Sequence, residues 1–354
     1  MRAGTIAQKL LFGLPPETAH GVSITALRSG LVPPFSFRDD RLAVTAAGLT
    51  FPNPLGMAAG YDKNAEVPDA LLRLGFGFAE VGTVTPLRQP GNQKPRIFRL
   101  EDDAAVINRL GFNNAGHDAV FQRLVARRSP GIVGVNIGAN KESADRIADY
   151  RLGVGRFAAL ASYITVNISS PNTPGLRGLQ DPDALHSLLT VVTEERSRQA
   201  KQPPIFLKIA PDLDDSALEA IAASVLQSGI EGMIISNTTI ARPPLKNRQA
   251  SETGGLSGKP LFHPSTVVLA KMRRLVGPEL TLIGVGGVDT AETALDKIQA
   301  GADLVQLYTG MIYRGAGIAE QILRGLQFEL QRSGAPNLRH LRDSRTEFWA
   351  SGGI

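Results

Sequence analysis

The stretch VNISSPNTPGLRGLQ, residues 166–180, places several side chains that can do chemistry directly after an apolar run. Asn167 and Asn172 carry amides, which both donate and accept hydrogen bonds, and a serine such as Ser170 can move a proton when its neighbours assist it. The same residue types also make ordinary turns, because proline presets the backbone and small polar side chains bond to nearby main chain. The spacing alone leaves open a turn or a catalytic loop.

Polar residues also end other apolar runs along the chain. They are Asp62, Lys63, Asn64, Thr83, Asn136, Lys208, Ser236, Asn237 and Thr238. A ring rich in amides suits a flat heterocycle that carries alternating C=O and N–H groups. The pattern therefore indicates a site for a pyrimidine or for the edge of a flavin.

Lys63 and Lys208 each stand at the end of an apolar run. Burying an unpaired ammonium is costly, and an anionic ligand would offset that cost. Ion pairs with carboxylates of the chain itself are the structural alternative, and the sequence does not choose between the two.

Three glycine-rich segments occur late in the chain, at residues 254–261, 284–287 and 308–310. Glycine lets main-chain N–H groups approach a phosphate, and barrels often bind phosphate at their last strand loops. Each glycine also suits a tight turn. Together the three segments favour a phosphorylated cofactor.

Short apolar runs alternate with longer helical patterns from about residue 54 onward. Eight runs are predicted strands: 54–60, 78–84, 131–140, 163–170, 204–211, 232–238, 280–287 and 302–310. Eight strand–helix units predict an α/β fold of the TIM (β/α)8-barrel type, with the reactive face at the carboxyl ends of the strands. A doubly wound open sheet also alternates in this way, but even spacing of eight runs favours closure.

Two segments lie outside this repeat. Residues 88–116 are predicted to form a hairpin excursion over the strand ends. Residues 1–38 are predicted to form an N-terminal helical arm, with residues 39–354 as the barrel. The arm's apolar residues at near-helical spacing are Ile6, Leu10, Leu11 and Leu14 and then, after Pro15 and Pro16, Val22, Ala26 and Leu27 on one face.

The arm has two interpretations. Amphipathic helices usually pack on the protein itself. Alternatively, the apolar faces of the arm meet lipid or an apolar substrate, with Arg2, Lys9 and Arg28 directed at anionic head groups.

Composition narrows the function classes. The 354 residues include no cysteine, which excludes disulfides, thiolate metal sites and a cysteine base. The net charge of +5 suits anionic ligands, but the basic residues are scattered, so we expect no nucleic-acid partner. No apolar run approaches the about 18 residues of a spanning helix, and the start lacks a signal-peptide pattern, so we expect the chain to stay in the cytosolic compartment.

The motifs AAGYDKNAE, NRLGFNN, VNIGANK, NISSPNTPGLRGLQ, GGLSGKPL and LVQLYTG occur in an order that resembles the dihydroorotate dehydrogenase family. The similarity includes the helical arm and so indicates the membrane-associated, quinone-using branch. It implies oxidation of dihydroorotate to orotate in pyrimidine biosynthesis, one non-covalent FMN per chain, and a membrane quinone as acceptor. It also implies a monomer, peripheral on the cytoplasmic face of the cell membrane, and no metal ion.

The resemblance assigns roles to particular residues. For FMN it implies Ala59, Gly60, Tyr61, Asp62, Lys63, Thr83, Asn136, Asn167, Lys208, Ser236, Gly258, Gly287, Tyr308 and Thr309. For the pyrimidine it implies Lys63, Asn108, Arg109, Leu110, Gly111, Phe112, Asn167, Asn172, Asn237 and Thr238. Ser170 is the implied base, beneath a lid at residues 173–175. Lys63 is implied to place a positive charge near the flavin and to bind the substrate carboxylate. His20 and Arg99 match the inner end of the quinone funnel.

Other classes remain as alternatives. A barrel that oxidises 2-hydroxy acids needs an active-site histidine on a late loop, and a tRNA uridine reductase needs a cysteine acid. His263 lies past the glycine loop, at an expected helix start, and cysteine is absent. A non-enzymatic phosphate-binding barrel explains the glycines, but it explains neither Ser170 between two asparagines nor the arm.

Overall fold

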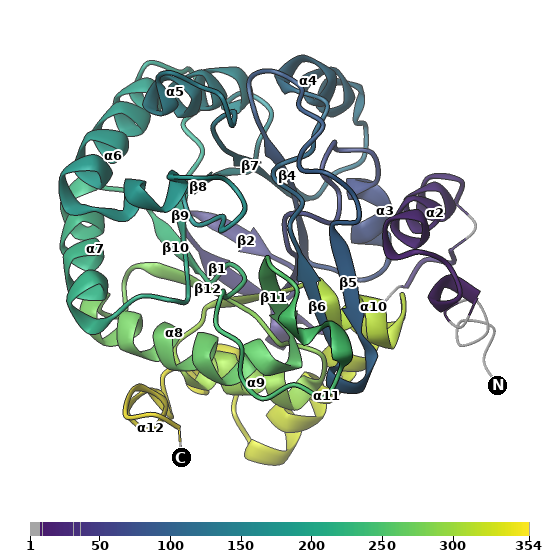
Figure 1. Ribbon diagram of the computed structural model, residues 1–354. Coiled ribbons are helices and arrows are strands. Elements are labelled where there is room, and N and C mark those ends of the chain that lie inside the picture. Colours follow the sequence, from purple (N-terminus) through teal and green to yellow (C-terminus); the bar gives the residue numbers. More distant parts are fainter. Residues whose placement is uncertain (1–7, 9, 31, 36, 354) are drawn as a thin grey trace.

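Eight parallel strands close into a barrel in the computed structural model, which describes residues 8, 10–30, 32–35 and 37–353 (Figure 1). Around the barrel the strands are β3 (Leu55–Met57), β4 (Phe78–Val84), β7 (Ile132–Ile137), β8 (Tyr163–Asn167), β9 (Ile205–Ile209), β10 (Gly232–Ile235), β12 (Thr281–Val285) and β13 (Leu304–Leu307). Each lies within one of the eight predicted runs. The closed barrel is therefore confirmed, and the open sheet is wrong.

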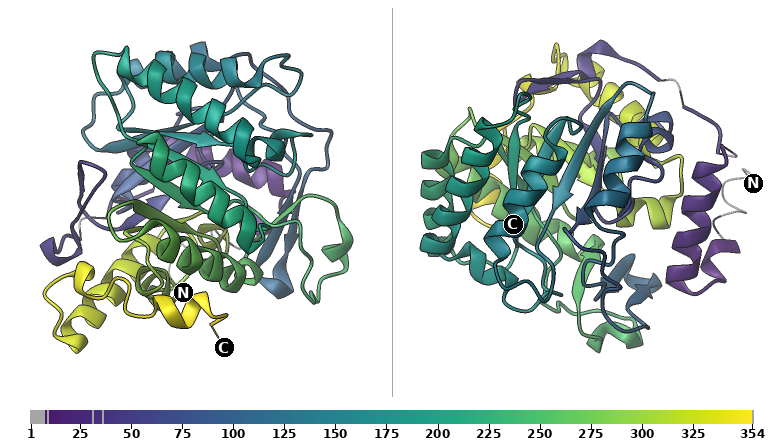
Figure 2. Two further views of the ribbon diagram at one scale, coloured as in Figure 1. Left: turned by 90° about the vertical axis from the view of Figure 1, so that its left-hand side faces the viewer. Right: turned by 90° about the horizontal axis from the view of Figure 1, so that it is seen from above.

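Helices follow the strands and cover the outside of the barrel (Figures 1 and 2). They are α3 (Pro68–Arg73), α4 (His117–Ala126), α5 (Arg146–Phe157), α6 (Pro182–Ser197), α7 (Asp215–Ser228), α8 (Phe262–Val276), α9 (Ala291–Gln299), α10 (Thr309–Arg314), α11 (Ile318–Ser333) and α12 (Thr346–Ala350). Local sequence sets their ends. For example, the Asp214 side chain accepts from the N–H of Ala217 to begin α7, and Gly229 ends that helix at φ +70°.

The barrel interior is layered because strand side chains alternate in direction. The lower layer contains the rings of Phe78, Tyr163 and Phe206, all fully buried. Two residues further along β4 and β9, Glu80 and Lys208 enter the layer above, which is polar. This polar layer separates the apolar base of the barrel from the mouth formed by the strand ends.

A small hairpin of β1 (Val44–Ala46) and β2 (Leu49–Phe51) packs on the base of the barrel core. Its Phe51 ring is fully buried and meets Phe78 edge to face at a centroid distance of 5.1 Å. The sequence analysis did not predict this hairpin, because three-residue strands carry too little periodicity to be recognised.

The predicted excursion over the strand ends is confirmed as the antiparallel pair β5 (Ile97–Leu100) and β6 (Ala105–Asn108). A third strand, β11 (Gly255–Gly258), pairs with β6 and was predicted only as a glycine loop. At Gly258, φ is +92° and a Cβ atom would collide with the carbonyl oxygen of Ala104. Glycine is thus needed there for the strand pairing as well as for any ligand.

The arm helix α2 (Pro16–Arg28) stands at the periphery beside β5 and α3 (Figures 1 and 2). Of the face predicted for it, Leu27 is buried, Ala26 borders the cavity described below, and Val22 is 45% exposed. Ile24 is buried instead of Val22, so the predicted face was partly wrong. Arg2, Ile6 and Lys9, for which the sequence predicted roles, lie outside the described residues. Within those residues, no helix combines the length and apolarity required to cross a membrane.

Candidate active site

A cavity of about 570 Å³ lies between the barrel mouth, the β5–β6–β11 roof and the N-terminal arm. Its volume is in the range of small-molecule and cofactor sites. The structure brings most of the predicted residues to its wall: His20, Ala59, Gly60, Tyr61, Lys63, Thr83, Arg99, Asn108, Leu110, Gly111, Phe112, Asn167, Ser170, Asn172, Lys208, Ser236, Asn237, Thr238, Gly258, Gly287, Tyr308 and Thr309.

Three predicted residues lie behind the wall. The Asp62 carboxylate accepts main-chain N–H groups of the loop after β3, at 2.8 Å from Glu66 and Val67, and so shapes that loop. Asn136 is fully buried beneath Thr83. The Arg109 guanidinium points to Glu252, at 2.7 Å.

Ser170 follows β8 and is nearly buried, at 5% exposure. Its Oγ accepts the main-chain N–H of Asn172 at 3.2 Å, which leaves the hydroxyl hydrogen available to another acceptor. Asn172 itself is held under the roof, where its amide donates to the Asn108 carbonyl at 3.2 Å. A base on this loop therefore faces a polar, enclosed space.

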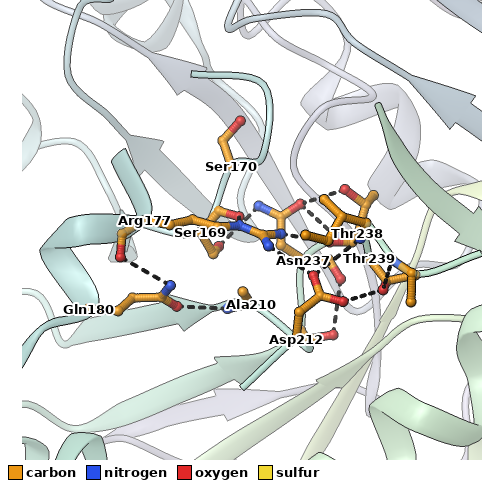
Figure 3. A network of polar contacts seen from close by, with 12 residues as sticks. Ser169, Ser170, Arg177, Gln180, Ala210, Asp212, Asn237, Thr238 and Thr239 are labelled. Atoms are coloured by element: carbon orange, nitrogen blue, oxygen red, sulfur yellow. Dashed lines mark hydrogen bonds and ion pairs between the residues drawn. The ribbon is translucent and has the colours of Figure 1, made fainter. Parts of the chain in front are cut away.

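Arg177 joins three loops at the barrel mouth (Figure 3). Its guanidinium donates to the carbonyls of Ser169 and Thr238, both at 3.2 Å, and pairs with Asp212 at 2.9 Å. Asp212 in turn accepts the Thr239 hydroxyl. Figure 3 shows the Ser170 side chain directed away from this cluster. The cluster therefore holds the loop by its main chain, and the Ser170 hydroxyl lies outside the cluster.

The two predicted lysines are enclosed. Desolvation by burial lowers the pKa of Lys63 to about 8, although the charges of Glu17 and Asp62 oppose the shift. Its ammonium donates to the Gly60 carbonyl at 2.7 Å. Burial also lowers the pKa of Lys208, against the charge of Glu80. Among the described residues, neither ammonium forms a direct ion pair, so an anion in the cavity would stabilise both charges.

The late glycine segments form one side of the cavity. At Gly287, φ is +72° and a Cβ atom would strike the main chain of Phe262. Nearby, the hydroxyls of Ser257 and Thr309 lie 2.9 Å apart. Glycine at 287 therefore permits the close approach of two main chains, and the hydroxyls on this side of the cavity could donate to a phosphate.

At the arm end of the cavity the lining is aromatic and apolar. The Tyr61 ring meets His20 and Tyr308 edge to face, with centroid distances of 5.3 and 5.5 Å. Burial first, and then the charge of Lys63, lowers the pKa of His20 to about 3, so its imidazole is neutral near pH 7. Arg99 donates to the carbonyls of Leu11 and Phe12, at 3.2 and 3.0 Å, and so fastens the arm to the roof.

Sequence reasoning missed several residues of this site. Ser23 lies on α2 one turn after His20, and its hydroxyl is 3.0 Å from that of Tyr61. Arg177 lies in the motif at residues 166–180, before helix α6, and the sequence there did not indicate a role for it. Asn92 lies in the roof segment, and its amide donates to the carbonyl of Asn172 at 3.3 Å. The helical spacing from His20 to Ser23 was a usable signal, but the other two contacts join distant segments.

The fold and site define a (β/α)8-barrel enzyme with one large, amide-rich cavity that extends from the strand ends to an N-terminal arm. The sequence model of the family described as dihydroorotate dehydrogenase matches residues 41–330. The chain belongs to this family, as its motifs predicted.

Curated relatives agree over nearly the full length. The chain is 65% identical over 349 residues to a protein of Mesorhizobium japonicum named dihydroorotate dehydrogenase (quinone), covering 98% of this chain and 97% of the relative. It is 60% identical over 352 residues to a protein of the same name from Rhizobium johnstonii, with the same two coverages.

Solved structures agree as well. The structure of DHODH from Eimeria tenella in complex with ferulenol superposes with a TM-score of 0.90 at 40% identity, covering 94% of this chain and 98% of that one. The ligand-free form of the Eimeria tenella protein also gives a TM-score of 0.90, at 42% identity, covering 93% and 99%.

Proposed function

We propose that this chain oxidises dihydroorotate to orotate, a step of pyrimidine biosynthesis, and passes the electrons to a quinone. The family membership and the names of the relatives support this reaction and this acceptor. The observation that carries the proposal is one continuous cavity that is polar around Ser170 and apolar around His20. One half-reaction then takes place at each end of a shared cofactor.

The cofactor we propose is FMN, bound without a covalent bond. The buried ammonium of Lys208, the amides at the strand ends and the wall of Gly258, Gly287 and the Ser257 and Thr309 hydroxyls fit a flavin with one phosphate. When bound, FMN would supply the two-electron chemistry that connects the substrate to the quinone. The FMN residues are those predicted above, with Asp62 and Asn136 acting from behind the cavity wall.

Ser170 is the proposed base. With FMN bound, the flavin would accept the hydride from carbon 6 of dihydroorotate while the Ser170 oxygen takes the proton from carbon 5 and the serine's own hydroxyl proton passes to a neighbouring acceptor. A hydroxyl is a weak base in water, so this role requires exclusion of solvent. The burial of Ser170, and the loop at residues 173–175 fastened by Arg146 to the Pro174 carbonyl at 2.7 Å, support that requirement.

The substrate lies between the strand ends and the roof in this proposal. Lys63 holds its carboxylate and also places a positive charge near the flavin. The amides of Asn108, Asn167, Asn172 and Asn237 read the ring's alternating C=O and N–H groups. Arg109, paired with Glu252, supports the roof strand instead of touching substrate.

The quinone end is proposed to lie beside α2, with the neutral imidazole of His20 and the guanidinium of Arg99 as its polar groups. Residues 1–38 form the arm that contacts the membrane, and residues 39–354 form the FMN barrel. We place the protein as a monomer, peripheral on the cytoplasmic face. The partly exposed Val22 and the exposed Leu10 on the arm support contact with lipid.

His263 does not support the alternative of a hydroxy-acid oxidase. Its Nε2 lies 2.7 Å from the carbonyl oxygen of Gly352 in the C-terminal segment, and the residue is absent from the cavity wall described here. That leaves dihydroorotate oxidation as the reaction that the site supports best.

The test is a pair of half-reactions. The purified protein should be yellow and should bleach under anaerobic conditions with dihydroorotate, but not with lactate or NADPH. A soluble quinone should then restore the colour, and fumarate should not. A protein that is colourless, or that bleaches with lactate alone, contradicts the proposal, and recolouring by fumarate contradicts the acceptor.

A further inference from the structure

Glu80 is a fully buried carboxylate in the polar layer beneath the cavity. It accepts three hydrogen bonds: from the Asn136 amide at 2.7 Å, from the Gln306 amide at 2.8 Å and from the Tyr163 hydroxyl at 3.1 Å. In the part of the chain that the structure describes, it makes no direct ion pair. Lys208 in the same layer acts on Glu80 only through its charge, so three neutral donors hold this carboxylate by direct contact.

The Glu80 oxygens accept all three of these hydrogen bonds, so its neighbour Asn136 presents its NH2 group to the carboxylate. The Asn136 oxygen is thereby turned upward, where it accepts the Thr83 hydroxyl at 2.6 Å. The Thr83 oxygen, having used its hydrogen, accepts from the Asn167 amide at 2.9 Å. Each side chain in this series therefore has one orientation in which its donor or acceptor matches that of the side chain before it.

The order continues into the cavity wall. The Asn167 oxygen accepts the Ser169 hydroxyl at 2.9 Å and faces the Asn237 amide at 3.4 Å. Asn167 Nδ2 has a second hydrogen beyond the one given to Thr83, and the residue borders the cavity. The wall therefore offers a bound ligand an N–H at this place, not an oxygen.

We propose that Glu80 is a positioning residue that sets the donor and acceptor sense of the ligand-facing amides, acting through Asn136 and Thr83. This inference deepens the proposed function and rests on it, because the ligand that meets the Asn167 N–H is the pyrimidine or the flavin edge. If the Asn136 amide flipped, the donor and acceptor direction of the following hydrogen bonds would reverse. Asn167 would then place its oxygen against a ligand carbonyl.

Glu80→Gln tests the proposal with almost no change of shape. Glutamine has one oxygen and one NH2 group, so one of the three donors around position 80 then faces another donor. Losing one buried hydrogen-bond match of this kind changes an equilibrium by about tenfold or more. We expect the dihydroorotate concentration for half-maximal anaerobic flavin reduction to rise by at least about tenfold.

The double variant Glu80→Gln, Asn136→Asp is the rescue. The glutamine NH2 group then donates to the new aspartate, whose second oxygen still accepts the Thr83 hydroxyl. The glutamine oxygen still accepts from Gln306 and Tyr163. We expect the dihydroorotate concentration for half-maximal flavin reduction (half-saturation) to return to within about threefold of the native value. The single variant Asn136→Asp brings two carboxylates together, and it completes a double-mutant cycle at positions 80 and 136.

The control is Asp303→Asn at the opposite end of the barrel, where Asp303 pairs with the buried Arg273 at 2.7 Å. It should lower the melting temperature and leave half-saturation unchanged. Native half-saturation in Glu80→Gln, or no recovery in the double variant, overturns the proposal. If Glu80→Gln does not fold, a folded double variant with near-native half-saturation supports it, and an unfolded one overturns it. Failure of the native protein to be reduced by dihydroorotate is a different result, which removes the proposed function itself.

Discussion

The Nε atom of Arg177 lies 3.2 Å from the carbonyl oxygen of Ser169, the residue directly before Ser170. The same guanidinium binds Thr238 and Asp212 on the loops after β10 and β9. The segment that carries the proposed base is therefore held from two neighbouring strand loops.

Replacing Arg177 with alanine should reduce kcat for dihydroorotate by about 10- to 100-fold, because a small displacement of a catalytic group is costly to the reaction. Flavin content, measured by absorbance after gel filtration, should remain near one per chain. Arg196→Ala is the matched control, since Arg196 also pairs with a carboxylate, Glu231, at 2.5 Å near the amino ends of the strands. Equal losses of kcat in both variants would indicate general destabilisation and not positioning.

Replacing Ser170 with alanine should leave FMN bound and slow flavin reduction by about 10²- to 10⁴-fold, the range of general-base contributions. Stopped-flow absorbance under anaerobic conditions measures this step. Ser170→Cys, which retains a group able to take up a proton, should keep more activity than the alanine variant. Unchanged reduction in Ser170→Ala would remove the serine from its proposed role.

Affinity for dihydroorotate should fall as the pH rises above about 8. Burial lowers the pKa of Lys63 to about 8 from its ordinary value, so the ammonium is charged below that pH and neutral above it. The substrate is an anion, so KM should rise by up to about tenfold per pH unit once Lys63 loses its proton. Initial rates between pH 6 and 10 give the profile. Lys63→Met should bind weakly at every pH and lack this rise, and a native KM that is flat to pH 10 contradicts the assignment.

Filling the arm end of the cavity should separate the two half-reactions. Ala19 lines the cavity from α2, and Ala19→Trp should slow reoxidation by a soluble quinone by at least about tenfold while flavin reduction by dihydroorotate stays near native. Thr25→Trp, on an exposed position of the same helix, should leave both steps unchanged. If Ala19→Trp slows reduction and reoxidation equally, the arm end is not a separate entrance.

Much of the fold was predictable because barrel strands are local features. All eight strands lay in short apolar runs, six of which end in Gly, Asn, Ser or Thr, and the roof hairpin lay in the one long interruption of the repeat. The β1–β2 hairpin and strand β11 were missed, since strands of three or four residues rich in small side chains carry little periodic signal. The face of α2 was partly wrong because the arm borders a cavity as well as a core, so Ala26 faces open space and Ile24 is buried.

By itself, the sequence determined which groups are available for chemistry and at the end of which strand each one lies. It also excluded cysteine chemistry, and its motifs identified the family. Tertiary structure alone decided how those groups are paired and oriented: that Asn136 lies behind Thr83, that Arg177 holds the main chain of Ser169, and that Glu80 sets the direction of the amides. Strand patterns depend on neighbours along the chain, whereas the direction of a buried hydrogen bond depends on partners such as Glu80 and Asn136, 56 positions apart. Barrel closure brings those partners together.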